Sequence, residues 1–152
     1  MVKVLFICLG NICRSPTGEG VFQALIEKEG LSDSISVDSA GTGAFHIGSS
    51  PDPRSQAAAR RRGVDLSRQR ARQVSLSDFD SFDYLLAMDT DNYANLMRIC
   101  PKGQEHKVYR MLDFGEGLDR RDVPDPYYGD DGFDLVLDLI ENASLGLLAD
   151  IR

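Results

Sequence analysis

The sequence is poor in cysteine, histidine and net positive charge, and each shortage excludes a class of protein. Three cysteines in 152 residues are too few, and odd in number, for the disulfide framework of a small secreted protein. The two histidines, His46 and His106, have no closely spaced cysteine or histidine companions, so no metal site is expected. Seventeen Lys and Arg against 24 Asp and Glu give a formal net charge of -7, which disfavours a nucleic acid partner.

Long hydrophobic runs are also absent. No stretch approaches the roughly 18 apolar residues of a membrane-spanning helix. The apolar start is interrupted by Lys3 and has no small-residue cleavage site after it, so no signal peptide is expected. With 42% hydrophobic and 27% charged residues, the composition suits one globular domain over residues 1–152. We therefore expect a cytoplasmic protein without membrane insertion.

Hydrophobic patterning predicts strands that alternate with helices along the chain. Strands are predicted at 2–8, 34–38, 82–88 and 107–112, and helices at 15–30, 53–62, 89–100 and 133–148. Ser15 and Asp89 are the predicted N-caps of the first and third helices. This alternation predicts an α/β fold, a single domain with a four-stranded parallel sheet and helices on both faces.

The stretch that follows the first strand, CLGNICRSP at 8–16, has the properties of an anion site. Ligands of parallel sheets bind beyond the carboxyl ends of the strands, and a helix N-terminus offers free N–H groups to an anion. Gly10 and Asn11 tolerate the left-handed backbone that a loop around a tetrahedral anion needs. Arg14 adds a planar guanidinium suited to two phosphate oxygens.

Cys8 lies at the base of this predicted loop. The helix N-terminus, Arg14 and the hydroxyl of Ser15 would each stabilise a negative charge on its sulfur, which makes Cys8 a candidate nucleophile. The alternative is a small buried hydrophobic residue at the end of a strand.

The sequence resembles the low-molecular-weight protein tyrosine phosphatases, as a bacterial-type member. CLGNICRSP matches their signature of Cys, five residues, Arg and then Ser or Thr. PDPYY at 124–128, VDSAG at 37–41 and SPDPR at 50–54 match the family as well. The resemblance implies a flavodoxin-like, phosphotyrosine phosphatase I-like fold. It implies hydrolysis of phosphotyrosine in proteins and of small aryl phosphates, including an acid phosphatase activity, through a cysteinyl phosphate.

The resemblance also implies a role for each site residue. Cys8 is the nucleophile, Arg14 holds the phosphate, and Asp125 is the general acid and then the general base. Ser39 supports the loop together with Asn11. The substrate-binding residues are Leu9, Gly10, Asn11, Ile12, Cys13, Ser15, Phe45, Tyr127 and Tyr128. No metal ion and no cofactor is required.

Asp125 lies in an acidic segment, so by itself it could equally be one more exposed turn carboxylate. Its flanking prolines distinguish it from its neighbours. Pro124 and Pro126 each fix one backbone angle and restrict the preceding residue. A catalytic acid needs such positioning.

Several alternatives stay open. Ile12 favours a phenyl ring, whereas related arginine phosphatases carry Thr at this position. The sister arsenate reductases need two further cysteines near the third strand and helix, and only Cys100 is available. A cysteine phosphocarrier domain would need no acid such as Asp125. A redox-sensing or anion-binding module that uses Cys8 and Cys13 would show no turnover. Phe45 is either a wall of the site or a loop residue that fills a gap in the core.

The resemblance supports a reversible disulfide between Cys8 and Cys13, for which the alternative is that Cys13 only packs within its loop. The expected partners are tyrosine-phosphorylated proteins and a cognate tyrosine kinase, with the chain a monomer or weakly self-associating. Residues 54–72 hold seven arginines and one acid. This stretch is either a dock for an acidic partner or a solvated helix end, and we favour the latter.

Overall fold

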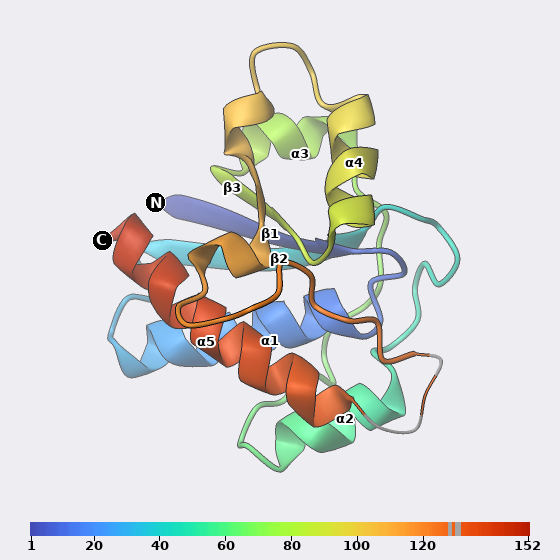
Figure 1. The fold of residues 1–152 in the computed structure, drawn as a ribbon, viewed down its shortest axis with the longest axis vertical. Coiled ribbons are helices and arrows are strands. Elements are labelled where there is room, and N and C mark those ends of the chain that lie inside the picture. Colours follow the sequence, from blue (N-terminus) through green and yellow to red (C-terminus); the bar gives the residue numbers. More distant parts are fainter. Residues whose placement is uncertain (128, 130–131) are drawn as a thin grey trace.

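A four-stranded parallel sheet lies at the centre of the molecule (Figure 1). The structure is a computed structural model and describes residues 1–127, 129 and 132–152. The strands are β1 (Val2–Cys8), β2 (Ile35–Gly41), β3 (Tyr84–Ala87) and β4 (Val108–Arg110), in the order β2-β1-β3-β4. All three strand pairs are parallel. The predicted α/β, flavodoxin-like fold is confirmed.

Helices cover both faces of the sheet. In Figure 1, α1 (Arg14–Lys28), α2 (Pro53–Arg60) and α5 (Phe133–Ile151) lie on one face, and α3 (Leu76–Ser81) and α4 (Thr90–Ile99) lie on the other. Two short 3-10 helices, η1 (Glu105–Lys107) and η2 (Met111–Phe114), flank β4. In the part of the chain that is described, no helix has both the length and the apolar character needed to cross a membrane.

Successive side chains of β1 enter two separate halves of the core, because neighbouring residues of a strand point to opposite faces. Val4 and Phe6 belong to the cluster that contains the apolar residues of α1 and α5. Leu5 and Ile7 belong to a second cluster, with Phe79 of α3 and Leu96 of α4. Packing on both faces explains the continuous apolar run of the strand.

The predicted element boundaries are partly wrong. α1 begins at Arg14 with Cys13 as its N-cap residue, so Ser15 is not the cap. The Ser15 hydroxyl lies 3.0 Å from the sulfur of Cys8 instead. Asp89 does cap α4, since its carboxylate accepts a hydrogen bond from the N–H of Asn92 at 2.6 Å.

Three strands differ in length from the prediction. β3 spans Tyr84–Ala87 and is shorter at both ends than the predicted strand at 82–88. β2 continues to Gly41, three residues beyond the predicted end at 38, because pairing with β1 extends as far as Cys8. β4 ends at Arg110, and the residues predicted to complete it form η2. The predicted loop over 39–50 is shorter by the same three residues.

The sequence analysis missed α3. Its signal is a capping box, in which Ser75 and Asp78 bond to each other's backbone N–H groups. A Ser followed three residues later by an acid, ahead of an apolar residue, predicts such a helix start. Phe79 of this helix is fully buried against the sheet.

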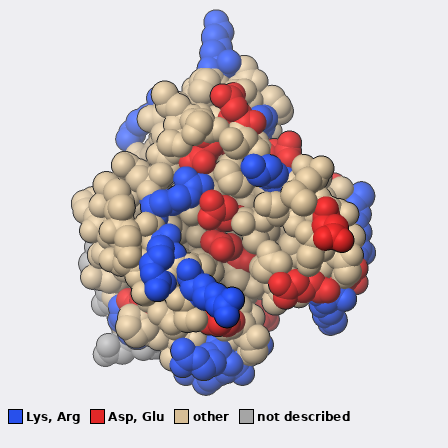
Figure 2. Space-filling model, turned by 180° about the vertical axis from the view of Figure 1, so that it is seen from behind, with Lys and Arg blue, Asp and Glu red and all other residues tan. Residues whose placement is uncertain are grey.

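Ion pairs neutralise much of the arginine-rich stretch 54–72. The face shown in Figure 2 carries basic side chains directly beside acidic ones. The pairs join Arg54 to Asp52, Arg61 to Asp134, Arg62 to Asp134, Asp138 and Glu141, and Arg72 to Asp38 and Asp78. These arginines therefore bind acidic groups of neighbouring segments of the chain.

We predict that Gly146→Ala lowers the free energy of unfolding, although alanine is the better helix former. A Cβ atom at Gly146 in α5 would overlap the backbone carbonyl oxygen of Phe114 in η2. Overpacking of this kind costs about 1–3 kcal/mol. Chemical denaturation measures the change, with Leu145→Ala as the control because that side chain is 63% exposed on the same helix. Equal stability of Gly146→Ala and the wild type would contradict the close packing of α5 on η2.

Candidate active site

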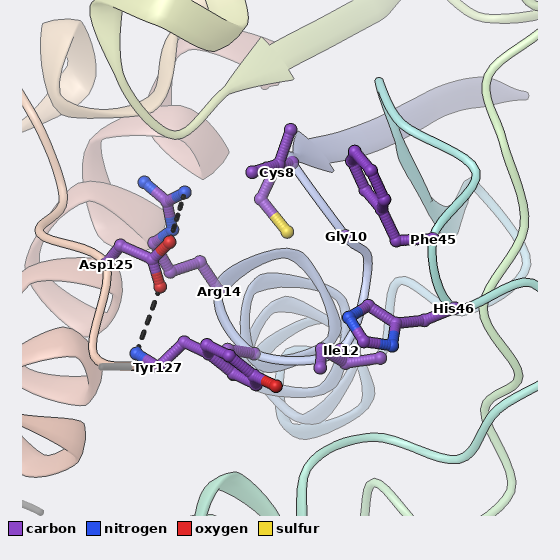
Figure 3. Close-up of a pocket in the computed structure, with 10 residues that line it drawn as sticks. Cys8, Gly10, Ile12, Arg14, Phe45, His46, Asp125 and Tyr127 are labelled. Carbon is purple, nitrogen blue, oxygen red and sulfur yellow. Dashed lines mark hydrogen bonds and ion pairs between the residues drawn. The ribbon is translucent and has the colours of Figure 1, made fainter. Parts of the chain in front are cut away.

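A cavity of about 330 Å³ opens at the carboxyl end of β1. It lies where the loop between β1 and α1 meets two distant segments of the chain, and Figure 3 shows their side chains around it. The lining residues are Cys8, Leu9, Gly10, Ile12, Cys13, Arg14, Phe45, His46, Asp125 and Tyr127.

The carbonyl groups of the loop between β1 and α1 accept hydrogen bonds from neighbouring segments of the chain. The carbonyl oxygens of Cys8 and Leu9 accept hydrogen bonds from the N–H groups of Thr42 and Gly43, both at 2.9 Å. The carbonyl of Ile12 accepts one from the residue before α2, at 2.8 Å. Because a trans peptide directs its carbonyl and its N–H to opposite sides, the N–H groups that follow these carbonyls face away from the outer segments. Such a loop offers N–H donors to an anion.

A chain of side-chain hydrogen bonds runs behind the cavity. Asn11 adopts a left-handed backbone with φ 57°. Its side-chain oxygen accepts from the N–H of Arg72 at 3.0 Å, so its amide nitrogen faces two serines. That nitrogen donates to Ser15 at 2.8 Å and to Ser39 at 3.0 Å. Since Ser15 accepts from Asn11, its own hydrogen is available to the Cys8 sulfur 3.0 Å away.

Arg14 is a buried cation, only 3% exposed, that joins three segments. Its guanidinium donates to the Asp89 carboxylate at 2.6 Å and to the Val123 carbonyl at 3.0 Å, and lies 3.6 Å from the Asp125 carboxylate. Burial lowers the pKa of Arg14, but Cys8 and the two carboxylates raise it more, so the net pKa is above its ordinary value. The side chain is therefore a permanent positive charge at the cavity.

Asp125 reaches the cavity from the segment between η2 and α5. That segment is joined to the sheet by the Val123 N–H, which donates to the Met88 carbonyl at 2.8 Å. One Asp125 carboxylate oxygen accepts from the N–H of Tyr127 at 3.0 Å, while the other faces Arg14 (Figure 3). A partly exposed carboxylate is thereby held beside the buried guanidinium.

The walls of the cavity include a residue that the sequence analysis missed. His46 follows Phe45 in a Gly- and Ser-rich loop, where no local pattern indicated that it would face the site. Its ring lies 6.2 Å from that of Tyr127, centroid to centroid. Gly10 permits this approach, since a Cβ there would lie 2.9 Å from the imidazole. Phe45, 75% exposed, forms the outer part of the wall.

Cys13 is a neutral thiol beside the cavity. Burial raises its pKa to about 12, although a hydrogen bond with Ser55 acts in the opposite direction. The negative charge of Asp52 raises the pKa further. Cys13 is therefore protonated at neutral pH.

The structure separates the predicted site residues into three groups. Those named above as lining residues face the cavity. Asn11, Ser15 and Ser39 are buried behind it and hold the loop. Tyr128 lies outside the described residues. Within the described part of the chain, no group of three or more His, Cys, Asp or Glu side chains could hold a metal ion.

Residues 3–152 match the family model described as low molecular weight phosphotyrosine protein phosphatase. The low molecular weight protein-tyrosine-phosphatase YfkJ of Bacillus subtilis is 45% identical over 100% of this chain and 97% of its own. The low molecular weight phosphotyrosine protein phosphatase of Schizosaccharomyces pombe is 43% identical over 92% of this chain and 91% of its own. A crystal structure of a protein tyrosine phosphatase from Entamoeba histolytica superposes with a TM-score of 0.96 at 41% identity, covering 99% of this chain and 97% of that one. The chain therefore belongs to the low molecular weight phosphotyrosine protein phosphatase family.

Proposed function

We propose that this phosphotyrosine phosphatase works through a cysteinyl phosphate on Cys8, with Asp125 as the proton donor. One observation carries the proposal: Cys8, Arg14 and Asp125 line the same cavity, although Asp125 is more than 100 residues from the other two. The Cys8 sulfur attacks phosphorus in line with the departing phenolic oxygen. Arg14 and the loop N–H groups bind the oxygens that carry the charge in the transition state.

Asp125 completes both steps. In the first, its proton passes to the phenolic oxygen as the bond from phosphorus to that oxygen breaks. In the second, the resulting carboxylate takes a proton from the water that attacks the cysteinyl phosphate, which releases inorganic phosphate and restores the thiolate. A cysteine phosphocarrier needs no such acid, so the placement of Asp125 favours hydrolysis.

The cavity walls support an aryl substrate. Ile12 presents an apolar side chain from the loop itself, and the rings of Phe45 and Tyr127 lie at the rim. A phenyl ring stacks on such surfaces, whereas a charged guanidinium loses solvation there. We propose phosphotyrosine rather than phosphoarginine as the substrate group, with His46 added to the predicted wall residues.

The cellular setting is also a proposal. The family implies phosphoprotein substrates, and we propose that a cognate tyrosine kinase supplies them in the cytoplasm to a monomeric or weakly self-associating enzyme. The three cysteines are free thiols, which suits a reducing compartment.

We further propose that Cys8 and Cys13 form a redox pair. Peroxide would convert the Cys8 thiolate to a sulfenic acid, and the Cys13 thiol would then displace water from it to form a disulfide. The same loop carries both sulfurs, and both residues line the cavity.

Cys8→Ser should abolish hydrolysis of p-nitrophenyl phosphate in metal-free buffer, because serine is a far weaker nucleophile here. Asp125→Asn should lower kcat by about 10²- to 10⁴-fold, the usual contribution of a general acid. Asp119→Asn is the matched control, since Asp119 is an exposed acid earlier in the same segment. Steady-state kinetics measure all three variants. Unchanged turnover in Cys8→Ser would refute the mechanism.

Ile12→Thr should shift the ratio of phosphotyrosine to phosphoarginine hydrolysis toward phosphoarginine. The reason is that a hydroxyl makes the wall more polar and less crowded for a guanidinium. Parallel kcat/KM measurements on two peptides that differ only in the phosphorylated residue give this ratio. Faster phosphoarginine cleavage by the wild type would overturn the choice of substrate.

Peroxide treatment of the wild type should inactivate it reversibly, and a thiol reductant should restore the activity. Cys13→Ser should instead lose activity irreversibly, because the Cys8 sulfenic acid has no partner and oxidises further. Cys100→Ser is the control and should recover like the wild type. Equal recovery of Cys13→Ser would show that no disulfide protects Cys8.

A further inference from the structure

We propose that Glu19 of α1 is a positioning residue, whose ionised carboxylate completes the hydrogen-bond chain behind the phosphate loop and tightens its hold on Cys8. The inference rests on the proposed role of Cys8 as the nucleophile. Neither the signature of the loop nor the mechanism uses this glutamate.

The chain of hydrogen bonds from Cys8 ends at Glu19. Ser39 accepts from the Asn11 amide at 3.0 Å, and its own hydroxyl donates to the Glu19 carboxylate at 2.7 Å. The other acceptor for this hydroxyl, the side-chain oxygen of Gln69, lies farther away at 3.5 Å. Cys8 and Glu19 are thus the two ends of one connected chain.

The hydrogen bonds of Asn11, in the middle of the chain, decide which groups donate and which accept. Because the N–H of Arg72 occupies the Asn11 side-chain oxygen, the Asn11 amide can only donate to the two serines. Each serine therefore has one hydrogen left. For Ser15 the nearer acceptor is the Cys8 sulfur at 3.0 Å and the farther one is the Ala40 carbonyl at 3.4 Å. For Ser39 the nearer acceptor is the Glu19 carboxylate at 2.7 Å. A hydroxyl that donates to a carboxylate becomes a better acceptor, so an ionised Glu19 strengthens the bond from Asn11 to Ser39.

Protonation of Glu19 changes this arrangement. A neutral carboxyl group is a weaker acceptor for Ser39, and its own proton can be donated to the Ser39 oxygen. The Ser39 hydrogen must then turn toward the more distant Gln69 oxygen. The hydrogen bond from the Asn11 amide to Ser39 becomes weaker, although the bonds of Asn11 to Ser15 and Arg72 remain.

The surroundings place this change near neutral pH. Burial raises the pKa of Glu19 to about 7, while the hydrogen bond from Ser39 lowers it, Asp38 raises it and Arg72 lowers it. Glu19 also lines a cavity of about 410 Å³ between α1 and the segment after α2. Three other charged residues line the same cavity: Glu27, Asp65 and Arg68. Glu19 is therefore neutral below about pH 7 and ionised above it.

The test is the ratio of kcat/KM between the wild type and Glu19→Gln on p-nitrophenyl phosphate, measured across pH. Glutamine keeps an oxygen acceptor for Ser39 but is neutral at every pH, so it imitates protonated Glu19. We expect a ratio near one at about pH 5 and about fivefold at pH 8, with the midpoint near 7. A fivefold change corresponds to about 1 kcal/mol, the difference in net stabilisation between a hydrogen bond to a charged acceptor and one to a neutral acceptor. Every pH effect that the two enzymes share cancels in the ratio.

Two further variants control the experiment. Glu27→Gln removes an exposed carboxyl group from the same helix and cavity and leaves the hydrogen-bond chain intact. The ratio of kcat/KM between the wild type and Glu27→Gln should be one at every pH. Ser39→Ala removes the link, so the addition of Glu19→Gln to it should have no further pH-dependent effect. If Glu19→Gln does not fold, Ser39→Ala alone must show the same rise in ratio from low to high pH.

A ratio that is independent of pH would overturn the proposal, since a merely structural glutamate lowers activity equally at all pH values. An equal pH-dependent ratio for Glu27→Gln would also overturn it, because the effect would then come from general surface charge. Failure of the catalytic mechanism is distinguishable, because it would appear as residual turnover in Cys8→Ser whatever the behaviour of Glu19.

Discussion

The buried guanidinium of Arg14 is the interaction on which the rest of the site depends. A cation that is only 3% exposed requires partners, because the loss of solvation is otherwise too costly. Its partners come from three places: Asp89 at the start of α4, the Val123 carbonyl in the segment after η2, and Asp125 farther along that segment. The sheet order places β1 beside β3, so the N-cap of α4 lies next to the loop that carries Arg14. The fold thus brings Asp125, the proposed general acid, next to Arg14, the proposed phosphate-binding residue.

An acidic protein binds an anion here because the attraction is local. The net charge of -7 gives no long-range attraction for phosphate. Loop N–H groups, the first turn of α1 and Arg14 act over a few ångströms, and they act strongly because the cavity is partly shielded from water. The outer segments that bind the loop carbonyls are as necessary as the loop, because without them the N–H groups would have no fixed direction.

The sequence was sufficient for the fold class and for the residues of the loop, since both are expressed by local patterns. The run from Val2 to Cys8 and the spacing from Cys8 to Arg14 are visible in a few consecutive letters. His46 was missed because its place in the wall depends on how a glycine-rich loop folds over Gly10. Ser15 was misassigned as the N-cap because α1 already begins at Arg14, which places Ser15 inside the first helical turn with its hydroxyl against Cys8. Glu19 carries no local signal at all, since its contact with Ser39 joins a helix to a neighbouring strand.

Gly41, at the end of β2, shows how a residue distant in sequence from the loop can be constrained by backbone alone. A Cβ atom there would lie 2.7 Å from the Leu9 carbonyl and 3.2 Å from the Asn11 nitrogen. Any side chain would therefore push against the loop itself, not against a flexible neighbour. In a redesign of this enzyme, the surface of α3 or α5 offers freedom to vary, whereas residue 41 offers none. The tolerance of a position to change is set here by its distance to the loop backbone, and chemical similarity between side chains is irrelevant to it.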